Sequence, residues 1–198
     1  MQHKSMEAIA QSLSADGIAS YRYNFPYMEK GGGLPDSKPV LLSAVRKAVE
    51  ETAKLASGAT LLAGGKSMGG RMTSRAAAES PLPGVSGIVF YGFPLHPAGR
   101  PGIERAVHLF KVTVPMLFLQ GTKDALADLH LLRPIIEELG EKATLYVVEG
   151  ADHSFHVPKR SGRTDGEVME EMASAVKRWT KFISSSLPSA HRELEQGS

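Results

Sequence analysis

The sequence predicts an α/β fold in which a mostly parallel sheet carries helices on both faces. Two observations support this fold class. Apolar residues recur with the helical period in several long segments, and short runs rich in branched and aromatic residues lie between those segments. Helices and strands that alternate in this way are typical of parallel sheets, because each strand returns to its starting edge through a helix.

The expected strands are short and mostly apolar. The run at 114–119 is continuously apolar, which is typical of a strand buried on both faces. The aromatic segment at 18–23 stops shortly before Pro26, in line with the restricted backbone around proline. The full set of expected strands is 18–23, 60–63, 87–91, 114–119 and 143–148.

The expected helices carry apolar residues one helical turn apart. In the first, Met6, Ile9 and Leu13 share a face, and Asp16-Gly17 ends the helix. Together the elements form one domain over residues 1–184, followed by a flexible polar tail at 185–198. The other helices are expected at 39–56, from the glycine-rich turn 64–70 to about 80, at 125–139 and at 166–183.

The composition narrows the classes of function. The 198 residues include 23 Lys and Arg and 21 Asp and Glu, so the formal charge of +2 is too small for the basic field that a nucleic-acid partner requires. No apolar run is long enough to cross a membrane, and the first residues read as an amphipathic helix rather than a signal peptide. Cysteine is absent, which favours the cytoplasm. We therefore expect a cytoplasmic protein with no cofactor, metal, membrane or nucleic-acid partner.

A candidate nucleophile lies in the glycine-rich turn. Ser67 stands in the stretch GKSMGG at 65–70, between an expected strand and an expected helix, as a G-x-S-x-G nucleophile elbow requires. The backbone amide of Met68, at the start of that helix, can stabilise an oxyanion. The same letters resemble the end of a phosphate-binding loop, but Thr60 stands where that pattern needs glycine. The elbow is therefore the favoured interpretation.

Two further residues are candidates for a catalytic triad. A serine hydroxyl is a weak nucleophile until a base accepts its proton, and the base must itself be oriented. Asp124 follows the strand at 114–119, and His153 follows the strand at 143–148. Because the carboxyl ends of parallel strands lie at one edge of the sheet, Ser67, Asp124 and His153 are expected to converge.

Each of these residues also has a structural interpretation. Asp124 can cap the helix that follows it, and capping and catalysis can coexist. His156, together with Asp152 and His153, resembles part of a metal site, but the sequence supplies no third and fourth ligands nearby.

Taken together, these motifs resemble the α/β-hydrolase superfamily, and the resemblance covers residues 1–184. It implies a nucleophile at Ser67, an acid at Asp124, a base at His153 and an oxyanion amide at Met68. Two more stretches are similar to the dienelactone-hydrolase-like branch, whose relatives include the non-specific-lethal complex subunit and testis-expressed proteins of animals. True dienelactone hydrolases use a cysteine nucleophile, which this chain lacks. The stretches that carry the resemblance are GKSMGGR at 65–71, QGTKD at 120–124, GADHSF at 150–155, YNFPY at 23–27 and GFPLHP at 92–97.

The expected function is hydrolysis of small soluble carboxylic esters, thioesters or lactones through an acyl-enzyme. The short connection between the strands at 87–91 and 114–119 leaves no room for a large apolar lid, so an open pocket is expected. The alternative is a catalytically weak or silent interaction module of the same fold. Side chains that follow strand ends are expected to line the pocket: Tyr27, Tyr91, Phe93, Leu95 and His96.

The resemblance also implies a strand upstream of the first helix. In relatives, an apolar strand ending in His-Gly-x-Gly precedes that helix and lies between the counterparts of the strands at 18–23 and 60–63. The chain enters its first helix within a few residues of Met1. We therefore expect a sheet that lacks this N-terminal strand, and an oxyanion hole that lacks one amide donor.

Overall fold

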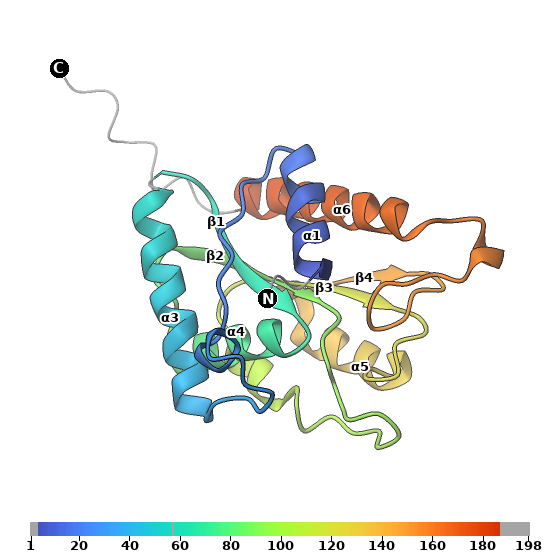
Figure 1. The fold of residues 1–198 in the computed structure, drawn as a ribbon, viewed down its shortest axis with the longest axis horizontal. Helices are drawn as coiled ribbons and strands as arrows, with labels where there is room; N and C mark the ends of the chain where they lie inside the picture. The colour runs from blue at the N-terminus through green and yellow to red at the C-terminus, as the bar shows by residue number, and fades with distance from the viewer. Residues whose placement is uncertain (1–3, 57, 187–198) are drawn as a thin grey trace.

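The computed structural model describes residues 4–56 and 58–186, and its centre is a parallel β-sheet. Four strands lie in the order β1-β2-β3-β4, and every neighbouring pair is parallel (Figure 1). This confirms the predicted sheet class. The strands are β1 (Leu61–Lys66), β2 (Val85–Tyr91), β3 (Met116–Gly121) and β4 (Ala143–Val148).

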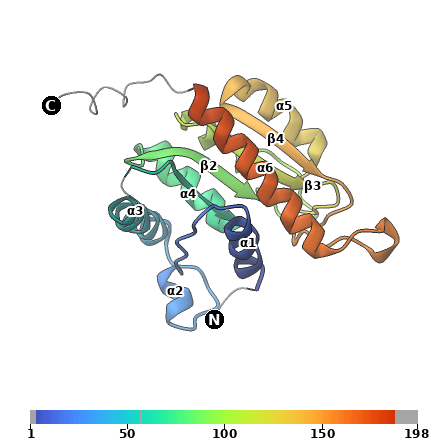
Figure 2. The same cartoon turned by 90° about the horizontal axis from the view of Figure 1, so that it is seen from above.

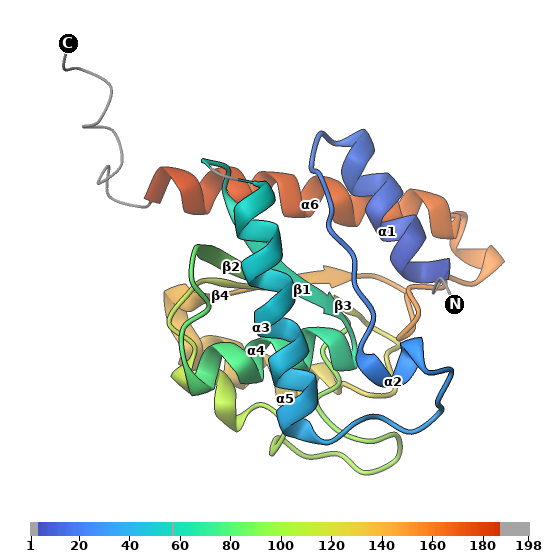
Figure 3. The same cartoon turned by 60° about the vertical axis from the view of Figure 1, so that its left-hand side comes forward.

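Helices cover both faces of the sheet, as the sequence predicted. Helices α1 and α6 cross one face, whereas α3, α4 and α5 pack on the other (Figures 2 and 3). The main helices are α1 (Lys4–Ala15), α3 (Lys38–Leu55), α4 (Met68–Glu79), α5 (Leu129–Leu139) and α6 (Asp165–Ser186). Short helical turns complete the set: α2 (Pro26–Glu29), η1 (Val107–Lys111), η2 (Gly140–Lys142) and η3 (Lys159–Ser161).

Alternation along the central strands divides the core between the two faces. Phe90 and Phe118 pack with α3, α4 and α5, and their rings lie 4.5 Å apart. Tyr91 and Leu119, one residue further along each strand, pack with α1 and α6. Because successive side chains of a strand point to opposite faces, a strand buried on both faces favours apolar residues on each, which explains the apolar run over residues 116–119 of β3.

Several predicted boundaries differ from the structure by a few residues, and three of the differences concern the site or the tail. Strand β1 continues through Lys66, so the turn is tighter than predicted. Helix α5 begins at Leu129 because the side chain of Asp128 accepts a hydrogen bond from the amide of His130 and caps the helix. Helix α6 continues to Ser186, so the first two residues of the predicted tail are helical, and residues 187–198 lie outside the described residues.

The predicted strand at 18–23 is wrong. These residues form no ladder, and most of them are exposed. Tyr21 to Phe25 border one side of a cavity whose other side is formed by Gly64 to Ser67 at the end of β1 and the start of the turn. With no backbone at pairing distance across that cavity, the propensity of the aromatic residues has no ladder to join. In the described residues, β1 therefore forms a free edge of the sheet.

Within residues 4–56 and 58–186, no helix combines the length and the apolar character that crossing a bilayer requires.

Candidate active site

Ser67 lies in a strained turn between β1 and α4. Its φ of 51° is in the left-handed region, which L-residues other than glycine rarely adopt. Its backbone amide donates to the carbonyl of Tyr91 at 3.0 Å, so the end of β2 holds the turn in place. The turn places the serine at the carboxyl edge of the sheet and at the N-terminus of α4, as the elbow interpretation predicted.

Gly70 allows α4 to approach the sheet closely. A Cβ atom at this position would lie 2.7 Å from the carbonyl oxygen of Gly65 and 2.9 Å from Cδ1 of Phe90. Both distances are too short for a real Cβ atom, so a side chain at this position would force α4 away from the sheet. The second glycine after the nucleophile is therefore a packing requirement of the elbow.

The structure brings the three predicted triad residues together. Nε2 of His153 lies 2.9 Å from Oγ of Ser67, and Nδ1 of the same ring lies 2.7 Å from Oδ2 of Asp124. With the proton on Nδ1, the imidazole donates to the carboxylate and accepts from the hydroxyl. This is the tautomer in which a base can take the serine proton.

A buried glutamine, Gln120, fixes the carboxylate of Asp124. The Asp124 side chain is fully buried, and its Oδ2 accepts a hydrogen bond from Nε2 of Gln120 at 2.5 Å. Its Oδ1 accepts from the amide of Leu126 at 2.8 Å, so the carboxylate also caps a turn. Oε1 of Gln120 accepts in turn from the amide of Phe93. The apolar run at 114–119 does not by itself indicate Gln120, although a polar residue directly after such a run is a usable signal.

The loop that carries His153 is tied to the loop that carries Asp124. The amide of Lys123 donates to the carbonyl of Ala151 at 2.9 Å, which joins the two loops. Oδ1 of Asp152 accepts from the amides of Ser154 and His156, so this carboxylate closes the turn around the histidine. The geometry assigns Asp152 to the turn and Asp124 to the imidazole.

Gly92 lies directly against the imidazole ring. A Cβ atom there would lie 3.3 Å from Cε1 of His153, and the φ of Gly92 is +70°. A larger residue would therefore strain the backbone and crowd the ring. The end of β2 thus supports both Ser67, through the Tyr91 carbonyl, and His153.

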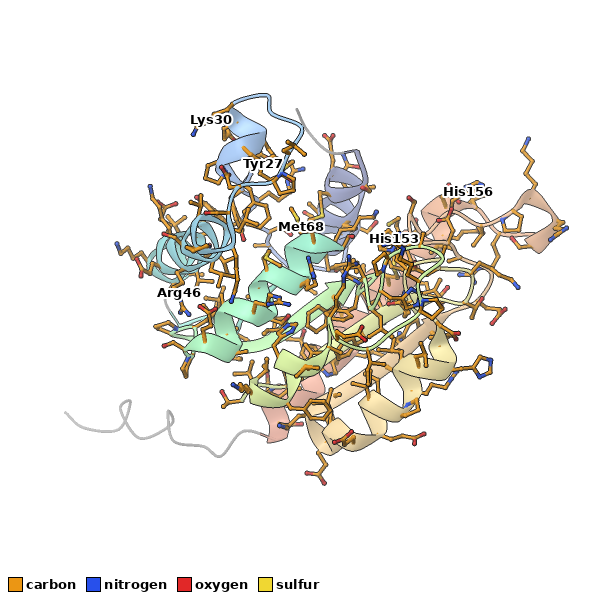
Figure 4. All side chains as sticks on the ribbon, turned by 90° about the horizontal axis from the view of Figure 1, so that it is seen from below. Tyr27, Lys30, Arg46, Met68, His153 and His156 are labelled. Carbon is orange, nitrogen blue, oxygen red and sulfur yellow. The ribbon has the colours of Figure 1, made fainter. Side chains whose placement is uncertain are left out.

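Met68 is the first residue of α4 and lies at the end of that helix nearest His153 and Tyr27 (Figure 4). The first amides of a helix have no partner within the helix, and here the earliest helical bond runs from the amide of Arg71 to the carbonyl of Ser67. The Met68 amide is thus available to a negative oxygen beside Ser67.

A cavity of about 700 Å³ opens beside Ser67. Of the predicted pocket residues, only Tyr27 lines it, and the ring of Tyr27 stacks on Phe25. The segment from Tyr21 to Glu29 supplies most of one wall, a contribution that sequence reasoning missed because it treated part of this segment as a strand. The full lining is Met6, Tyr21 to Phe25, Tyr27 to Glu29 and Gly64 to Gly69.

The other four predicted pocket residues are buried away from this cavity. Phe93 and Leu95 are fully buried in the core formed with α3, α4 and α5. His96 donates from Nδ1 to the carbonyl of Pro97 and accepts at Nε2 from the amide of Asp128, so both ring nitrogens serve the loop. Tyr91 packs against α1 and α6, and burial raises the pKa of its phenol. These four side chains are buried in the fold and do not line the cavity.

Lys66, the residue before the nucleophile candidate Ser67, is a basic residue within the elbow. It lines the cavity and is half-buried. Burial lowers the pKa of its ammonium, while the carboxylates of Asp124 and Asp152 act in the opposite direction. Lys66 therefore places its amino group on the wall of the cavity beside Ser67.

The chain belongs to the α/β hydrolase domain family, whose model matches residues 1–181. Several solved structures share its fold. A serine hydrolase without a lid from Xanthomonas campestris is 24% identical over 90% of this chain and 75% of its own, with a TM-score of 0.68. A monoacylglycerol lipase from Paleococcus ferrophilus is 17% identical over 92% of this chain and 90% of its own, with a TM-score of 0.66. Est1E from Butyrivibrio proteoclasticus, solved with ferulic acid bound, is 16% identical over 93% of this chain and 84% of its own, with a TM-score of 0.62.

Proposed function

We propose that this protein is a serine hydrolase that cleaves small carboxylic esters, thioesters or lactones. One observation carries the proposal: the unbroken hydrogen-bond chain from Oγ of Ser67 through the imidazole of His153 to the carboxylate of Asp124. The three residues come from loops after three different strands. An alignment of this kind at the carboxyl edge of a parallel sheet is the arrangement that nucleophilic acyl transfer needs.

The proposed reaction has two halves. Nε2 of His153 takes the proton from Oγ of Ser67 while Oγ forms a bond to the acyl carbon of the substrate. The carbonyl oxygen becomes negative and accepts a hydrogen bond from the amide of Met68. When the acyl carbon releases the alcohol or thiol, His153 returns the proton to that leaving group. Water then attacks the acyl-serine with the same base, which releases the acid and restores the hydroxyl.

Several features support small substrates. The connection between β2 and β3 holds only loop segments and η1, so this connection places no long helix over the carboxyl edge. The cavity volume of about 700 Å³ is in the range of sites for small molecules. Among the structural relatives, Est1E was solved with ferulic acid, a small aromatic acid.

A silent interaction module of the same fold is the alternative. The aligned triad argues against it, because a binding module requires neither the strained Ser67 nor a buried carboxylate oriented on a histidine. A placement in the dienelactone-hydrolase-like branch is a finer proposal, which rests on the stretches YNFPY at 23–27 and GFPLHP at 92–97.

The test is a hydrolysis assay with p-nitrophenyl acetate and butyrate, a matched thioester series and small lactones. We expect turnover of at least one class by the wild-type chain, and a loss of at least about a thousandfold in Ser67→Ala. Folded protein that hydrolyses none of these compounds, or a Ser67→Ala variant with unchanged turnover, would contradict the proposal. Preference for lactones over linear esters would support the dienelactone-hydrolase-like placement.

A further inference from the structure

A cluster of arginines lies between α4 and the segment that leads into η1. Arg71 and Arg75 are four residues apart on α4 and so share a face of the helix. Arg105 comes from the loop before η1, and its charge acts on Arg71. All three side chains are partly buried. His108 of η1 packs into the same region, where its Nε2 lies 2.8 Å from Oγ of Ser74.

The guanidinium groups of this arginine cluster lack acidic partners. Within residues 4–56 and 58–186, no salt bridge involves Arg71, Arg75 or Arg105. The Nε atoms of Arg71 and Arg75 are buried and have no hydrogen-bond partner there. Arg105 makes one long contact, 3.5 Å from Nη1 to the carbonyl of Pro94. A desolvated donor without an acceptor is costly, so two such donors in one cluster favour binding of an acceptor at this place.

Arg46, labelled in Figure 4, shows the contrast. It reaches from α3 to the last turn of α4, where Nη2 donates to the carbonyl of Ala76 at 2.6 Å and the guanidinium also contacts the carbonyl of Ser80. Its donors are therefore used by the fold itself. Apart from the long contact of Arg105 with the carbonyl of Pro94, no hydrogen bond in the described residues uses the guanidinium donors of the arginine cluster in this way.

The neighbouring charges do not neutralise the cluster. Glu79 binds Lys38 at 2.6 Å and interacts with Arg75 only over a longer range. Burial and the charges of Arg75 and Arg71 lower the pKa of His108 to about 4, so His108 is uncharged at neutral pH. The charged and titratable groups that interact electrostatically with the cluster, or with Glu79 beside it, are Lys38 and Arg46 from α3, Glu79 from α4 and His108 from η1.

We propose that Arg71, Arg75 and Arg105 form a binding site for the phosphate group of a small soluble molecule. Guanidinium groups bind oxyanions through paired N–H donors. A phosphate carries about two negative charges and three acceptor oxygens, enough for donors from several arginines, whereas a carboxylate offers one charge and two oxygens. Phosphate thus matches both the charge and the number of donors.

This site is separate from the cavity beside Ser67, which none of the three arginines lines. The proposal does not rest on hydrolase activity, because binding can be measured without turnover.

The test is isothermal titration calorimetry with inorganic phosphate at pH 7.5, with the ionic strength held constant by sodium chloride. We expect saturable one-site binding to the wild-type chain. Arg71→Gln and Arg105→Gln should each weaken the affinity about tenfold or more, because each removes charged donors from the phosphate. Arg178→Gln, at an exposed arginine of α6, is the matched control and should bind phosphate as the wild type does.

Several results would overturn the proposal. One is the absence of saturable phosphate binding by folded wild-type protein. Another is equal affinity in the wild type, Arg71→Gln and Arg105→Gln. Acetate that binds as tightly as phosphate would contradict the assigned ligand class, and binding to phosphatidylcholine vesicles containing phosphatidic acid without binding to phosphate would point to a membrane surface instead. Arg105→Gln keeps the test decisive if Arg71→Gln fails to fold, because Arg105 lies in a loop.

Discussion

The side-chain amide of Gln120 donates a hydrogen bond from Nε2 to Oδ2 of Asp124, 2.5 Å away, and both side chains are buried. The same oxygen accepts from Nδ1 of His153. The strand residue Gln120 therefore fixes which way the carboxylate faces, and the carboxylate fixes the imidazole. Gln120 is a positioning residue in this account, because it reaches the substrate only through two other side chains.

Gln120→Met should lower kcat by about 10- to 100-fold with a smaller change in KM, because a charge-assisted hydrogen bond that orients the acid is lost. Ester hydrolysis at several substrate concentrations measures this. Thr122→Val is the matched control, since Thr122 lies in the same loop as Asp124 and accepts from the amide of Gly150 in the His153 loop, whereas its hydroxyl makes no hydrogen bond to Asp124 in the described residues. Equal losses in both variants would reduce Gln120 to a purely structural role.

Asp124→Asn should reduce turnover by several orders of magnitude, about 10⁴-fold by analogy with other triads, while the fold persists. The neighbouring Asp128 provides the control, because Asp128→Asn keeps a good N-cap at the start of α5 and does not touch His153. Melting temperatures must accompany both rate measurements. If Asp128→Asn loses activity and Asp124→Asn does not, the acid has been misassigned.

The sheet and the triad could be predicted from sequence because both depend on local patterns. Strand β3 begins with an apolar run, and Asp124 lies in the loop just after the strand, so the edge of the sheet on which the acid lies follows from parallel topology. Likewise, Gly64 and Gly70, on either side of Ser67, are required by contacts between neighbouring elements: Gly64 against the carbonyl of Val89 and Gly70 against Phe90.

The strand at 18–23 and the pocket could not be predicted in the same way. A strand exists only if another backbone lies at pairing distance, and the composition of residues 18–23 does not report that. A position just after β2 does not predict that a side chain lines the pocket, because Phe93 at such a position packs inward on Phe90 and Phe118. The cavity wall comes instead from the segment around α2, whose placement depends on long-range packing.

Gly70→Ala should destabilise the protein by about 1–3 kcal/mol, because the added Cβ would lie 2.7 Å from the carbonyl of Gly65. Gly69→Ala is a close control, since a Cβ at Gly69 meets nothing within 4 Å. Its melting temperature should equal or slightly exceed that of the wild type, because alanine favours helix more than glycine does. Urea denaturation measures the unfolding free energy of both variants, and thermal melting measures their melting temperatures. Equal destabilisation of the two variants would contradict the close approach of α4 to the sheet.

Acid should destabilise the protein through His108. Its pKa is lowered to about 4 from the ordinary 6.5, first by burial and then by Arg75 and Arg71. The unfolded chain takes up this proton as the pH falls below about 6.5, whereas the folded protein does so only near 4. Stability is therefore lost as the pH falls through this window. His108→Gln should flatten the decline of the unfolding free energy in urea titrations across these pH values.

The control for the acid experiment is His156→Gln. His156 is exposed, and Asp165 raises the pKa of its imidazole, so its stabilising contribution is present at low pH and is lost only as the pH rises above the ordinary histidine value. This variant should leave the slope between pH 6.5 and 4 nearly unchanged. If it flattens that slope as much as His108→Gln does, the acid sensitivity does not come from His108.

Covalent labelling by a fluorophosphonate tests the central claim most directly, because the probe reacts with a serine that a neighbouring base has activated. We expect intact-mass analysis to show one adduct per chain, and peptide mapping to place it on Ser67. The label should be absent in Ser67→Ala and strongly slowed in His153→Ala. Folded wild-type protein that takes no label, or an adduct on another serine that persists in Ser67→Ala, would contradict the assignment of Ser67 as the nucleophile.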